Sequence, residues 1–246
     1  MTYNINLEKE LIKLRFTKSL KTYRENAIVQ KQMAENLSKM ITPKTFNNIL
    51  ELGCGTGFLT EQIYHNFHYK NYDTVDMVDG CKNYIKKISD NINFICADIE
   101  NFVPEKKYDL IISNATLQWL ENLPDYINKI SEYLNKNGIF AFTLFGKNHF
   151  KEMNLFLKNN LKYYSLEDIR IICSGYTIKN ITEQSIKQEF NTPKDVLYHI
   201  KKTGVNALSK SSWTISDYKK FNEEYKNYCD NNISLTYHPL YVILSK

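Results

Sequence analysis

Short apolar runs alternate with amphipathic segments through the first 145 residues of the chain. Apolar and β-branched runs bounded by polar residues are typical of strands buried on both faces. Such runs occur at 49–52, 72–77, 93–99, 108–114 and 139–145. Between them, helical spacing of apolar residues recurs at 58–63, 84–88 and 122–134. Because successive strand, loop and helix units imply right-handed crossovers, the pattern predicts an α/β fold with a doubly wound parallel sheet.

The flanking parts of the chain lack this alternation. Two apolar stripes predict helix over 7–40, less regular at 15–23, and Thr42-Pro43 ends it. Asn137-Gly138 indicates a helix C-cap and turn. Further helices are predicted at 148–164, from 165 onward, at 192–204 and at 216–228, and strands within 177–190 and over 234–244. The chain is therefore predicted to be one domain, with an arm (1–45), a core (46–146) and a region of insertions and final strands (147–246).

Three glycines follow the first apolar run. Gly53, Gly55 and Gly57 bare the backbone N–H groups where a strand turns into a helix, which suits an anionic or polar ligand. The dinucleotide motif G-x-G-x-x-G would need glycine where Phe58 stands. The run from Glu51 to Gly57 instead resembles motif I, E/D-x-G-x-G-x-G, of class I S-adenosylmethionine-dependent methyltransferases. The alternative is a glycine-rich turn that binds nothing.

Polar residues stand at the carboxyl ends of four predicted strands, where doubly wound sheets bind ligands. Asp76, about 20 residues beyond the last glycine, is predicted to accept the ribose hydroxyls. Asp73, near the expected strand start, and Asp79, in the following turn, are its rivals. Asp98 is placed to accept from an adenine amine. The backbone N–H of the next residue would donate to the ring. The four strand-end residues are Glu51, Asp76, Asp98 and Asn114.

Composition narrows the class of protein. The formal charge of +5 is carried by lysine, with few arginines and no basic run, which disfavours nucleic acid and leaves an acidic protein partner or a solvated surface. Five cysteines without a C-x-x-C pair predict reduced thiols in the cytoplasm and no metal site. No apolar run is long enough to span a bilayer, and the N-terminus has no signal-peptide pattern. Neither a membrane nor a nucleic acid is an expected partner.

Four further segments narrow the resemblance. Residues 15–34 resemble the arm R-F…Y…-Q-x-x-M/S-A, and residues 113–119 resemble S-N-A/L-x-x-Q-W. Residues 201–206 resemble K-x-x-G-A-T/N, with Val205 where alanine is usual, and residues 235–238 resemble a terminal T-Y-H strand. Together these segments resemble the malonyl-[acyl-carrier protein] O-methyltransferase family, which methylates the free carboxyl of a malonyl thioester at the start of pimeloyl synthesis for biotin.

The resemblance implies a fold and a cofactor. The fold is the Rossmann-like seven-stranded sheet of class I methyltransferases, ending in an antiparallel pair, with an N-terminal helical arm and helical insertions capping the active site. The cofactor is S-adenosyl-L-methionine. Its expected binding residues are Gln30, Glu51, Gly53, Gly55, Asp76, Met77, Asp98, Ile99 and Asn114.

The implied reaction needs no general base, because a carboxylate is already ionised at neutral pH. One or two hydrogen-bond donors should orient it, and Tyr23 and Asn114 are the candidate catalytic residues. The mouth of the site would be lined by Gln118, Trp119, Lys201, Lys202, Tyr237 and His238, although each could instead be structural or solvated. The partner would be malonyl-acyl-carrier protein or malonyl-CoA, and the protein a monomer.

Two other functions stay open. A free-acid carboxyl methyltransferase resembling the trans-aconitate enzymes shares the S-N-x-x-x-Q-W segment, but would need arginines in a closed pocket. A non-catalytic cofactor-binding module would transfer no methyl group to any acceptor. An amino-methylating nucleic-acid enzyme is disfavoured, because residues 113–116 are not an N-P-P-Y segment.

Overall fold

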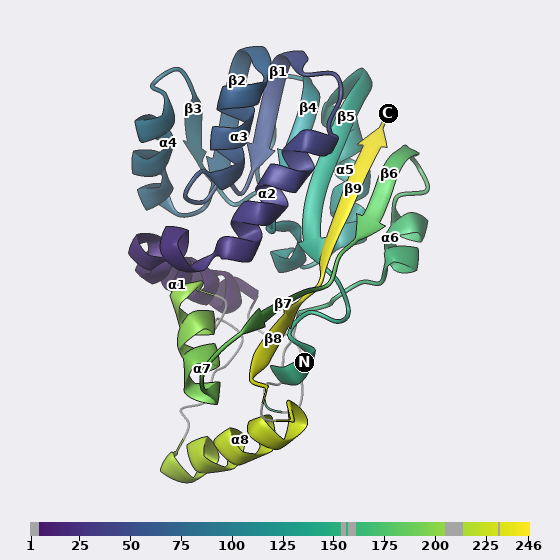
Figure 1. The fold of residues 1–246 in the computed structure, drawn as a ribbon. Coiled ribbons are helices and arrows are strands. Elements are labelled where there is room, and N and C mark those ends of the chain that lie inside the picture. Colours follow the sequence, from purple (N-terminus) through teal and green to yellow (C-terminus); the bar gives the residue numbers. More distant parts are fainter. Residues whose placement is uncertain (1–4, 154–155, 157–160, 205–213, 231) are drawn as a thin grey trace.

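The computed structural model describes residues 5–153, 156, 161–204, 214–230 and 232–246. Its main sheet has the strand order β3-β2-β1-β4-β5-β9-β6 (Figure 1). The strands are β1 Thr45–Leu52, β2 His68–Asp76, β3 Asn93–Cys96, β4 Tyr108–Ser113, β5 Leu134–Phe145, β6 Thr177–Glu183 and β9 Pro239–Ser245. The first five pair in parallel, whereas β9 runs antiparallel to both β5 and β6. The predicted sheet with its antiparallel pair is confirmed.

Helices cover both faces of this sheet. Successive side chains of a strand point to opposite faces, so Ile49 packs in one apolar cluster and Leu50 in the other. The first cluster includes residues of α2 (Ile28–Met40), α3 (Phe58–Asn66) and α4 (Lys82–Ile88). The second includes residues of α5 (Leu123–Ile130) and α6 (Leu166–Ile172). Burial on both faces explains why the strands read as continuous apolar runs.

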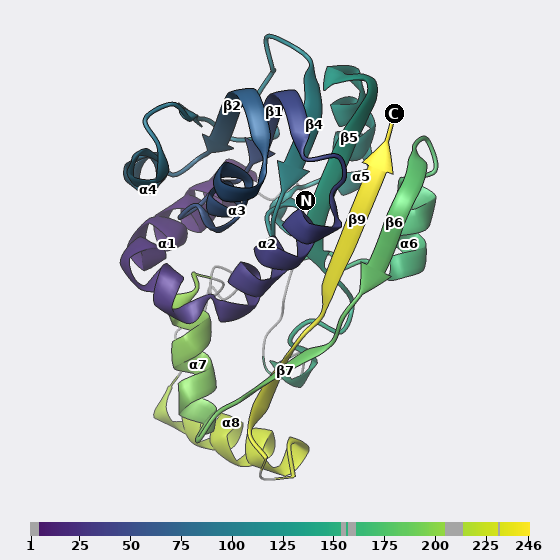
Figure 2. The same cartoon turned by 45° about the horizontal axis from the view of Figure 1, so that its top comes forward.

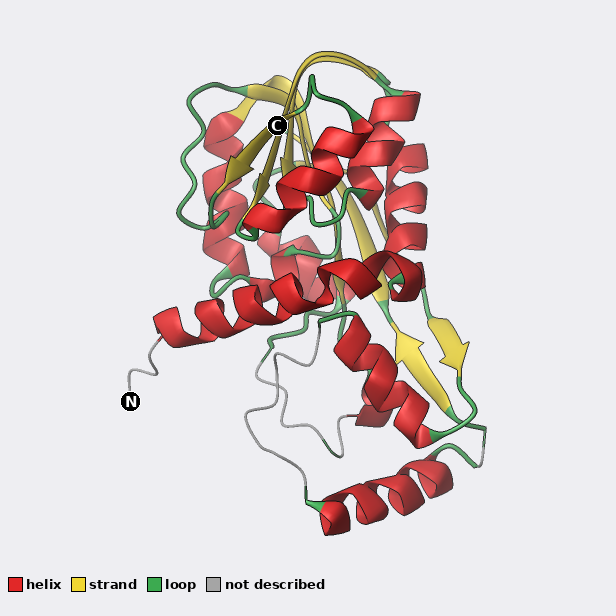
Figure 3. Ribbon diagram, turned by 90° about the vertical axis from the view of Figure 1, so that its left-hand side faces the viewer, coloured by secondary structure: helices red, strands yellow, loops and turns green. Residues whose placement is uncertain are grey.

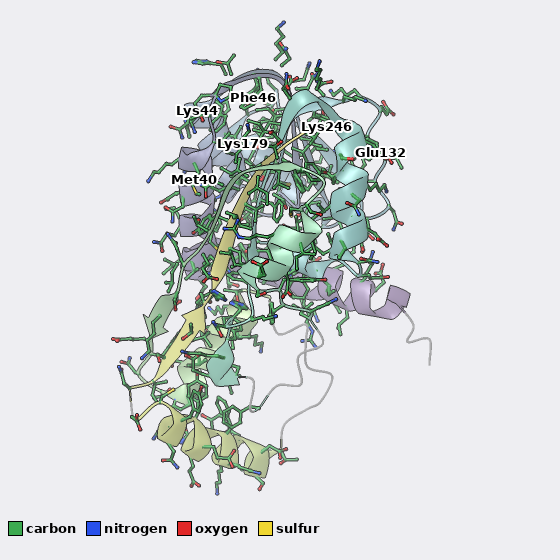
Figure 4. The ribbon with its side chains drawn as sticks, turned by 90° about the vertical axis from the view of Figure 1, so that its right-hand side faces the viewer. Met40, Lys44, Phe46, Glu132, Lys179 and Lys246 are labelled. Atoms are coloured by element: carbon green, nitrogen blue, oxygen red, sulfur yellow. The ribbon has the colours of Figure 1, made fainter. Side chains whose placement is uncertain are left out.

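A smaller lobe extends from the carboxyl ends of the parallel strands (Figure 3). It contains the two-stranded sheet of β7 (Ile186–Glu189) and β8 (Ser234–Tyr237), together with α7 (Pro193–Lys202) and α8 (Ile215–Tyr228). We call these four elements the cap. Figure 4 shows Lys44, Lys179 and Lys246 at the opposite end of the main sheet. The helices predicted at 192–204 and 216–228 correspond to α7 and α8, and both belong to the cap.

The N-terminal arm differs from its prediction. Helix α1 (Ile5–Asn26) is continuous through residues 15–23, and the break comes at Ala27, before α2. The two helices need different directions, because α2 packs on the sheet and α1 crosses the strand ends between the sheet and the cap (Figure 2). The segment 15–23 is helical throughout, and its apolar residues Phe16, Leu20 and Tyr23 line the pocket at the strand ends.

The predicted strand over 234–244 is two strands. It breaks at His238, because β8 pairs with β7 in the cap whereas β9 lies between β5 and β6. Likewise, the segment 177–190 contains both β6 and β7 rather than one strand. One stretch of chain therefore belongs to both sheets.

The prediction of a helix at 148–164 is wrong over its described part, which holds only the 3-10 turn Lys151–Met153. The N–H of Phe150 bonds the carbonyl of Thr236 in β8 instead of a preceding turn, and Phe150 has a left-handed φ of 52°. Residues 154–155 and 157–160 lie outside the described residues.

The predicted helix at 122–134 is shorter than expected. Helix α5 passes into a 3-10 turn, Ser131–Tyr133, and β5 begins at Leu134. Asn137-Gly138 is not a helix C-cap but lies within β5, where the register with β4 shifts. The positive φ of Asn137, 64°, fits this irregularity. Within the described ranges, no helix has the length and apolarity needed to cross a membrane.

Candidate active site

A pocket lies at the carboxyl ends of β1, β2 and β4, and we call it the strand-end pocket. It has a volume of about 910 Å³ with its open mouth included. Helix α1 forms one wall through residues spaced along a single face. Those residues are Ile12, Phe16, Ser19, Leu20 and Tyr23. The predicted residues in its lining are Tyr23, Glu51, Gly53, Gly55, Asp76, Met77, Ile99, Asn114 and Trp119.

The glycine turn lies close to the segment that follows β4. Gly53 has a φ of 74°, and a Cβ there would lie 2.3 Å from the side chain of Thr116. Gly55, with a φ of 53°, has no atom within 4 Å of such a Cβ. Gly53 is thus needed for packing, whereas Gly55 leaves space toward the pocket. The Oγ1 of Thr56, also in the lining, is buried without a hydrogen-bond partner in the described structure.

Asp76 ends β2, as predicted, and holds the glycine turn. One carboxylate oxygen accepts from the N–H of Gly55 and the other from the N–H of Val78, each at 2.9 Å. Burial raises the pKa of Asp76, although these two donors oppose the shift. Its rival Asp73 lies inside β2 rather than at its start and accepts from the hydroxyl of Tyr108 at 2.9 Å. The ribose prediction for Asp76 therefore fits the pocket better.

Glu51 is almost completely buried at the base of the pocket. Its carboxylate accepts from the Oγ1 of Thr60 at 2.8 Å and from the hydroxyl of Tyr72. Burial raises the pKa of Glu51 to about 7, although these bonds favour the ionised form. A cationic ligand group beside it would therefore convert a partly protonated acid to the carboxylate.

The residues expected to bind the adenine of the cofactor only partly line the strand-end pocket. Met77 and Ile99 line it, but Asp98 lines the adjacent groove. There the Nζ of Lys9, on α1, contacts Asp98 at 2.6 Å and also pairs with Glu100. The sequence reasoning missed Lys9, because a lysine on a solvated helix gives no sign of a partner so distant in sequence.

A second ion pair fixes the other half of α1. Arg24 donates to both carboxylate oxygens of Glu61 at 2.7 and 2.9 Å and to the carbonyl of Thr56 at 2.6 Å. Its guanidinium also lies 4.9 Å from the ring centre of Phe58. Arg24 therefore ties the arm to the start of α3, directly beside the glycine turn.

A smaller pocket adjoins the first and shares four residues with it: Phe16, Tyr23, Ala115 and Trp119. We call it the aromatic pocket. Phe16 and Trp119 pack edge to face with ring centres 5.4 Å apart. The remaining lining is Gln30, Gln118, Phe145, His149, Leu161, Tyr163 and Thr203. No lysine or arginine lines either pocket among the described residues.

Three polar atoms in the aromatic pocket are buried without a hydrogen-bond partner among the described residues: Gln30 Oε1, Gln118 Oε1 and His149 Nδ1. The Nε2 of Gln118 donates to the carbonyl of Ala115 at 2.7 Å, which fixes its Oε1 as the free end. Buried polar atoms normally have partners, so three in one pocket indicate a polar ligand or water there. His149 was missed, although it follows the end of the fifth strand closely, as the predicted acids follow theirs.

Asn114 and Gln30 link β4 to the arm. The Nδ2 of Asn114 donates to the backbone carbonyl of Gln30 at 3.0 Å, and its Oδ1 accepts from Thr143 at 2.7 Å. Gln30 lines the aromatic pocket rather than the strand-end pocket, whereas Asn114 lines the strand-end pocket. The side chain of Asn114 therefore already has structural partners at both of its polar ends.

Four predicted mouth residues lie outside the linings of both pockets. The hydroxyl of Tyr237 is 2.5 Å from the Nε2 of buried His199. The Nδ1 of His238 accepts from the N–H of Asn148 at 3.1 Å, so its Nε2 donates to Glu183. His238 thus fixes the turn after β5 instead of lining the mouth. The other two are Lys201 and Lys202, in the last turn of α7.

The fold corresponds to that of known proteins. A family model described as a methyltransferase domain matches residues 23–191. The YcgJ protein of Bacillus subtilis has a similar structure, with a TM-score of 0.65 at 13% identity over 87% of this chain and 98% of that one. The N-methyltransferase NodS of Bradyrhizobium japonicum, solved with S-adenosyl-L-homocysteine, gives 0.51 at 15% identity over 89% and 86%. The family match and the fold together define a class I methyltransferase.

The sequence relatives identify the family within this class. Malonyl-[acyl-carrier protein] O-methyltransferase 2 of Ilyobacter polytropus is 38% identical over 98% of this chain and 99% of the relative. Malonyl-[acyl-carrier protein] O-methyltransferase of Chlorobium luteolum is 34% identical over 97% and 96%. The chain belongs to the malonyl-[acyl-carrier protein] O-methyltransferase family.

Proposed function

We propose that this protein transfers a methyl group from S-adenosylmethionine to the free carboxyl of malonyl-acyl-carrier protein, giving the methyl ester that primes pimeloyl synthesis for biotin. The observation that carries the proposal is the 38% identity over 98% of the chain, because that match includes the arm and the cap as well as the glycine motif. A general methyltransferase would need to share only the cofactor-binding core.

The strand-end pocket has the chemistry that the cofactor requires. S-adenosylmethionine supplies an electrophilic methyl group on a positively charged sulfur. Asp76 would accept from the ribose hydroxyls, and Met77 and Ile99 would contact the adenine. Glu51 and the Gly53–Gly55 turn would hold the aminocarboxyl end, with Gln30 and Asn114 supporting that side. Asp98 would reach the adenine amine only at the groove where it now pairs with Lys9.

The chain must orient the acceptor and exclude water rather than remove a proton. The acceptor carboxylate is ionised near neutral pH, so its oxygen can form the new bond to carbon as the carbon–sulfur bond breaks. Tyr23, which lines both pockets, and Asn114 are the proposed donors, and Gln118 and Trp119 would form the acceptor wall. Helix α1 would shield the reacting atoms from water.

A labelling assay tests the function. The protein is incubated with methyl-labelled S-adenosylmethionine and malonyl-carrier protein, malonyl-CoA or trans-aconitate. Base-labile label on the malonyl thioester is the expected result. Label on trans-aconitate alone would overturn the proposal, and label on none would favour a binding module. The free-acid alternative is the weaker one, since it would need an arginine that the described lining lacks.

The acidic carrier is proposed to dock beside the last turn of α7, where Lys201 and Lys202 lie on the cap. The double change Lys201→Glu and Lys202→Glu should lower kcat/KM for malonyl-carrier protein about tenfold and leave that for malonyl-CoA nearly unchanged. Lys179→Glu is the matched control, because Lys179 lies at the far end of the sheet (Figure 4). Equal losses with both substrates would contradict docking there.

The chain is also proposed to act as a single-domain monomer over residues 1–246. One stretch, β8 followed by β9, belongs to both the cap sheet and the main sheet, which supports a single folding unit. Light scattering coupled to size exclusion should give the mass of one chain. A stable dimer would contradict this part of the proposal.

A further inference from the structure

His149 has an unusual position for a histidine. It is 1% exposed and stacks against Phe145 and Phe150, each with ring centres 3.8 Å apart and with interplanar angles of 13° and 22°. Two nearly parallel rings at that distance must lie on opposite faces of the imidazole. Any polar contact of the ring is therefore confined to its edge, and the ring lines the aromatic pocket.

The turn that carries His149 is fixed by the strand break at His238. The N–H of Gly146 donates to the carbonyl of His238 at 2.8 Å, and that of Asn148 donates to its ring. Beyond the histidine, the N–H of Phe150 donates to the carbonyl of Thr236 at 2.7 Å. Three backbone N–H groups of the turn, two bonded to carbonyls and one to the His238 ring, thus set the position of the imidazole.

The ring is also uncharged. Burial lowers the pKa of His149 well below its ordinary value of 6.5, and nearby His238 acts in the same direction. A neutral imidazole carries one N–H and one bare nitrogen, so it can donate a hydrogen bond without bringing a positive charge. The Nδ1 atom is buried and has no partner in the described structure, so its hydrogen-bonding capacity is unused.

We infer that His149 is a further catalytic residue of the proposed methyl transfer, donating a hydrogen bond from Nδ1 to the acceptor carboxylate in the aromatic pocket. The inference rests on the proposed function. The aromatic pocket adjoins the strand-end pocket through Tyr23 and Trp119, so an acceptor held there faces the cofactor. Among the described residues of the strand-end motifs, the hydroxyl of Thr56 is also buried without a partner, but Thr56 lines the strand-end pocket and not the aromatic pocket.

The neutrality of this donor suits the reaction. The carboxylate loses its charge as the ester forms, so a full positive charge beside it would stabilise the reactant more than the transition state. A single neutral donor fixes the direction of the attacking oxygen at less cost to its reactivity. The lack of lysine and arginine in the described lining agrees with this choice.

The test compares three substitutions at one position. His149→Phe keeps a flat ring between Phe145 and Phe150 but removes the donor. His149→Asn can place an amide N–H near the position of Nδ1, whereas His149→Gln places it near Nε2. We expect kcat/KM for malonyl-carrier protein to fall about a hundredfold in His149→Phe and His149→Gln, and less than tenfold in His149→Asn. The dissociation constant for S-adenosylhomocysteine, measured by calorimetry, should stay within about twofold in all three.

A second readout does not depend on turnover. In protein with 15N-labelled histidine, saturated with S-adenosylhomocysteine and malonyl-carrier protein, the Nδ1 of His149 should show the chemical shift of a protonated nitrogen and Nε2 that of a bare one. Protonation at Nε2 in the complex would overturn the inference. So would a His149→Phe variant with wild-type kcat/KM, or one that loses S-adenosylhomocysteine binding as well.

The activity of the wild-type protein on different carboxylic acids distinguishes failure of the proposed function from failure of the inference about His149. If it methylates a different carboxylic acid, the substrate proposal is wrong and the three variants are compared on that acid. If the wild-type protein methylates no acid, both proposals are wrong. Thermal melts of each variant separate lost packing from the lost donor.

Discussion

The strand-end pocket and the aromatic pocket adjoin each other yet are built in different ways. The strand-end pocket has acids at its strand ends and open backbone at Gly55, and most of its polar wall comes from short segments directly after strands. The aromatic pocket has neutral polar atoms among rings, contributed by α1, α2, the turn after β4 and the turn after β5. The first suits a charged ligand of fixed shape, whereas the second suits an acceptor whose charge disappears during the reaction.

The largest expected effect is on the folding of the glycine turn. Gly53→Ala places a Cβ 2.3 Å from Thr116 in a left-handed conformation, and should lower the free energy of unfolding by about 4 kcal/mol. Gly55→Ala meets no atom within 4 Å and carries only the left-handed penalty, about 1–2 kcal/mol. Urea denaturation measures both. Equal losses would mean that the turn is not packed against the segment after β4.

The second largest effect is expected on cofactor affinity, through the proposed contact of Asp76 with the ribose. Asp76→Asn should raise the dissociation constant for S-adenosylhomocysteine about a hundredfold, because hydrogen bonds to a charged acceptor are worth about 1.5–3 kcal/mol each. Calorimetry measures it, and thermal melting verifies folding. Asp79→Asn, in the 3-10 turn just beyond, is the control and should change affinity less than twofold. Unchanged affinity in Asp76→Asn would show that the ribose lies elsewhere.

Cofactor affinity should also depend on pH through Glu51. With a pKa of about 7, this acid is mostly neutral at pH 6 and mostly ionised at pH 8, so affinity for the cationic cofactor should rise about tenfold over that range. In Glu51→Gln the rise should disappear. Without ligand, the effect of Glu51 on the stability of the fold has the opposite dependence on pH. Between pH 4.5 and 7 the folded protein binds more protons than the unfolded chain, so stability falls as pH rises.

The smallest effect concerns the arm. Arg24 and Glu61 are about one-third exposed, so their ion pair should contribute under about 1 kcal/mol. Glu61→Gln should weaken cofactor binding about twofold at low salt and not at 1 M salt, where the charges are screened. Lys226, on the cap helix α8, offers Lys226→Gln as a control. A larger, salt-independent loss would mean that Glu61 supports the glycine turn by another route.

The pattern of apolar and polar residues predicted those parts of the site that depend on one strand and the residues next to it. Most of the strand-end pocket could be read from sequence, because β1, β2 and β4 each have a polar residue at their carboxyl ends and the sheet brings the ends together. Asp76 is an example, whereas Asp98, beyond β3, lines the adjacent groove instead.

The aromatic pocket could be read only in part. Gln30 and Gln118 stand in the arm and S-N-x-x-x-Q-W motifs, whereas His149 stands in no motif. His149 follows β5 closely, but nothing local shows that Phe145 and Phe150 cover its faces.

The sequence errors have a similar cause. The stretch 234–244 reads as one mostly apolar, strand-forming run, so the change of sheet at His238 is not apparent from the hydrophobic pattern. His238 was expected at the mouth, but its ring bonds fix the turn after β5. The break at Ala27 depends on where α1 and α2 must pack, which is a property of the assembled fold.

The position of β9 bears on how the protein forms in the cell. Because β9 lies between β5 and β6, both earlier strands leave a ribosome with a hydrogen-bonding edge exposed, and the sheet can close only after Pro239–Ser245 has followed. Pairing so distant in sequence is slow, and open edges can associate with other chains. The nascent protein is therefore expected to depend on chaperones until its last core strand has been made.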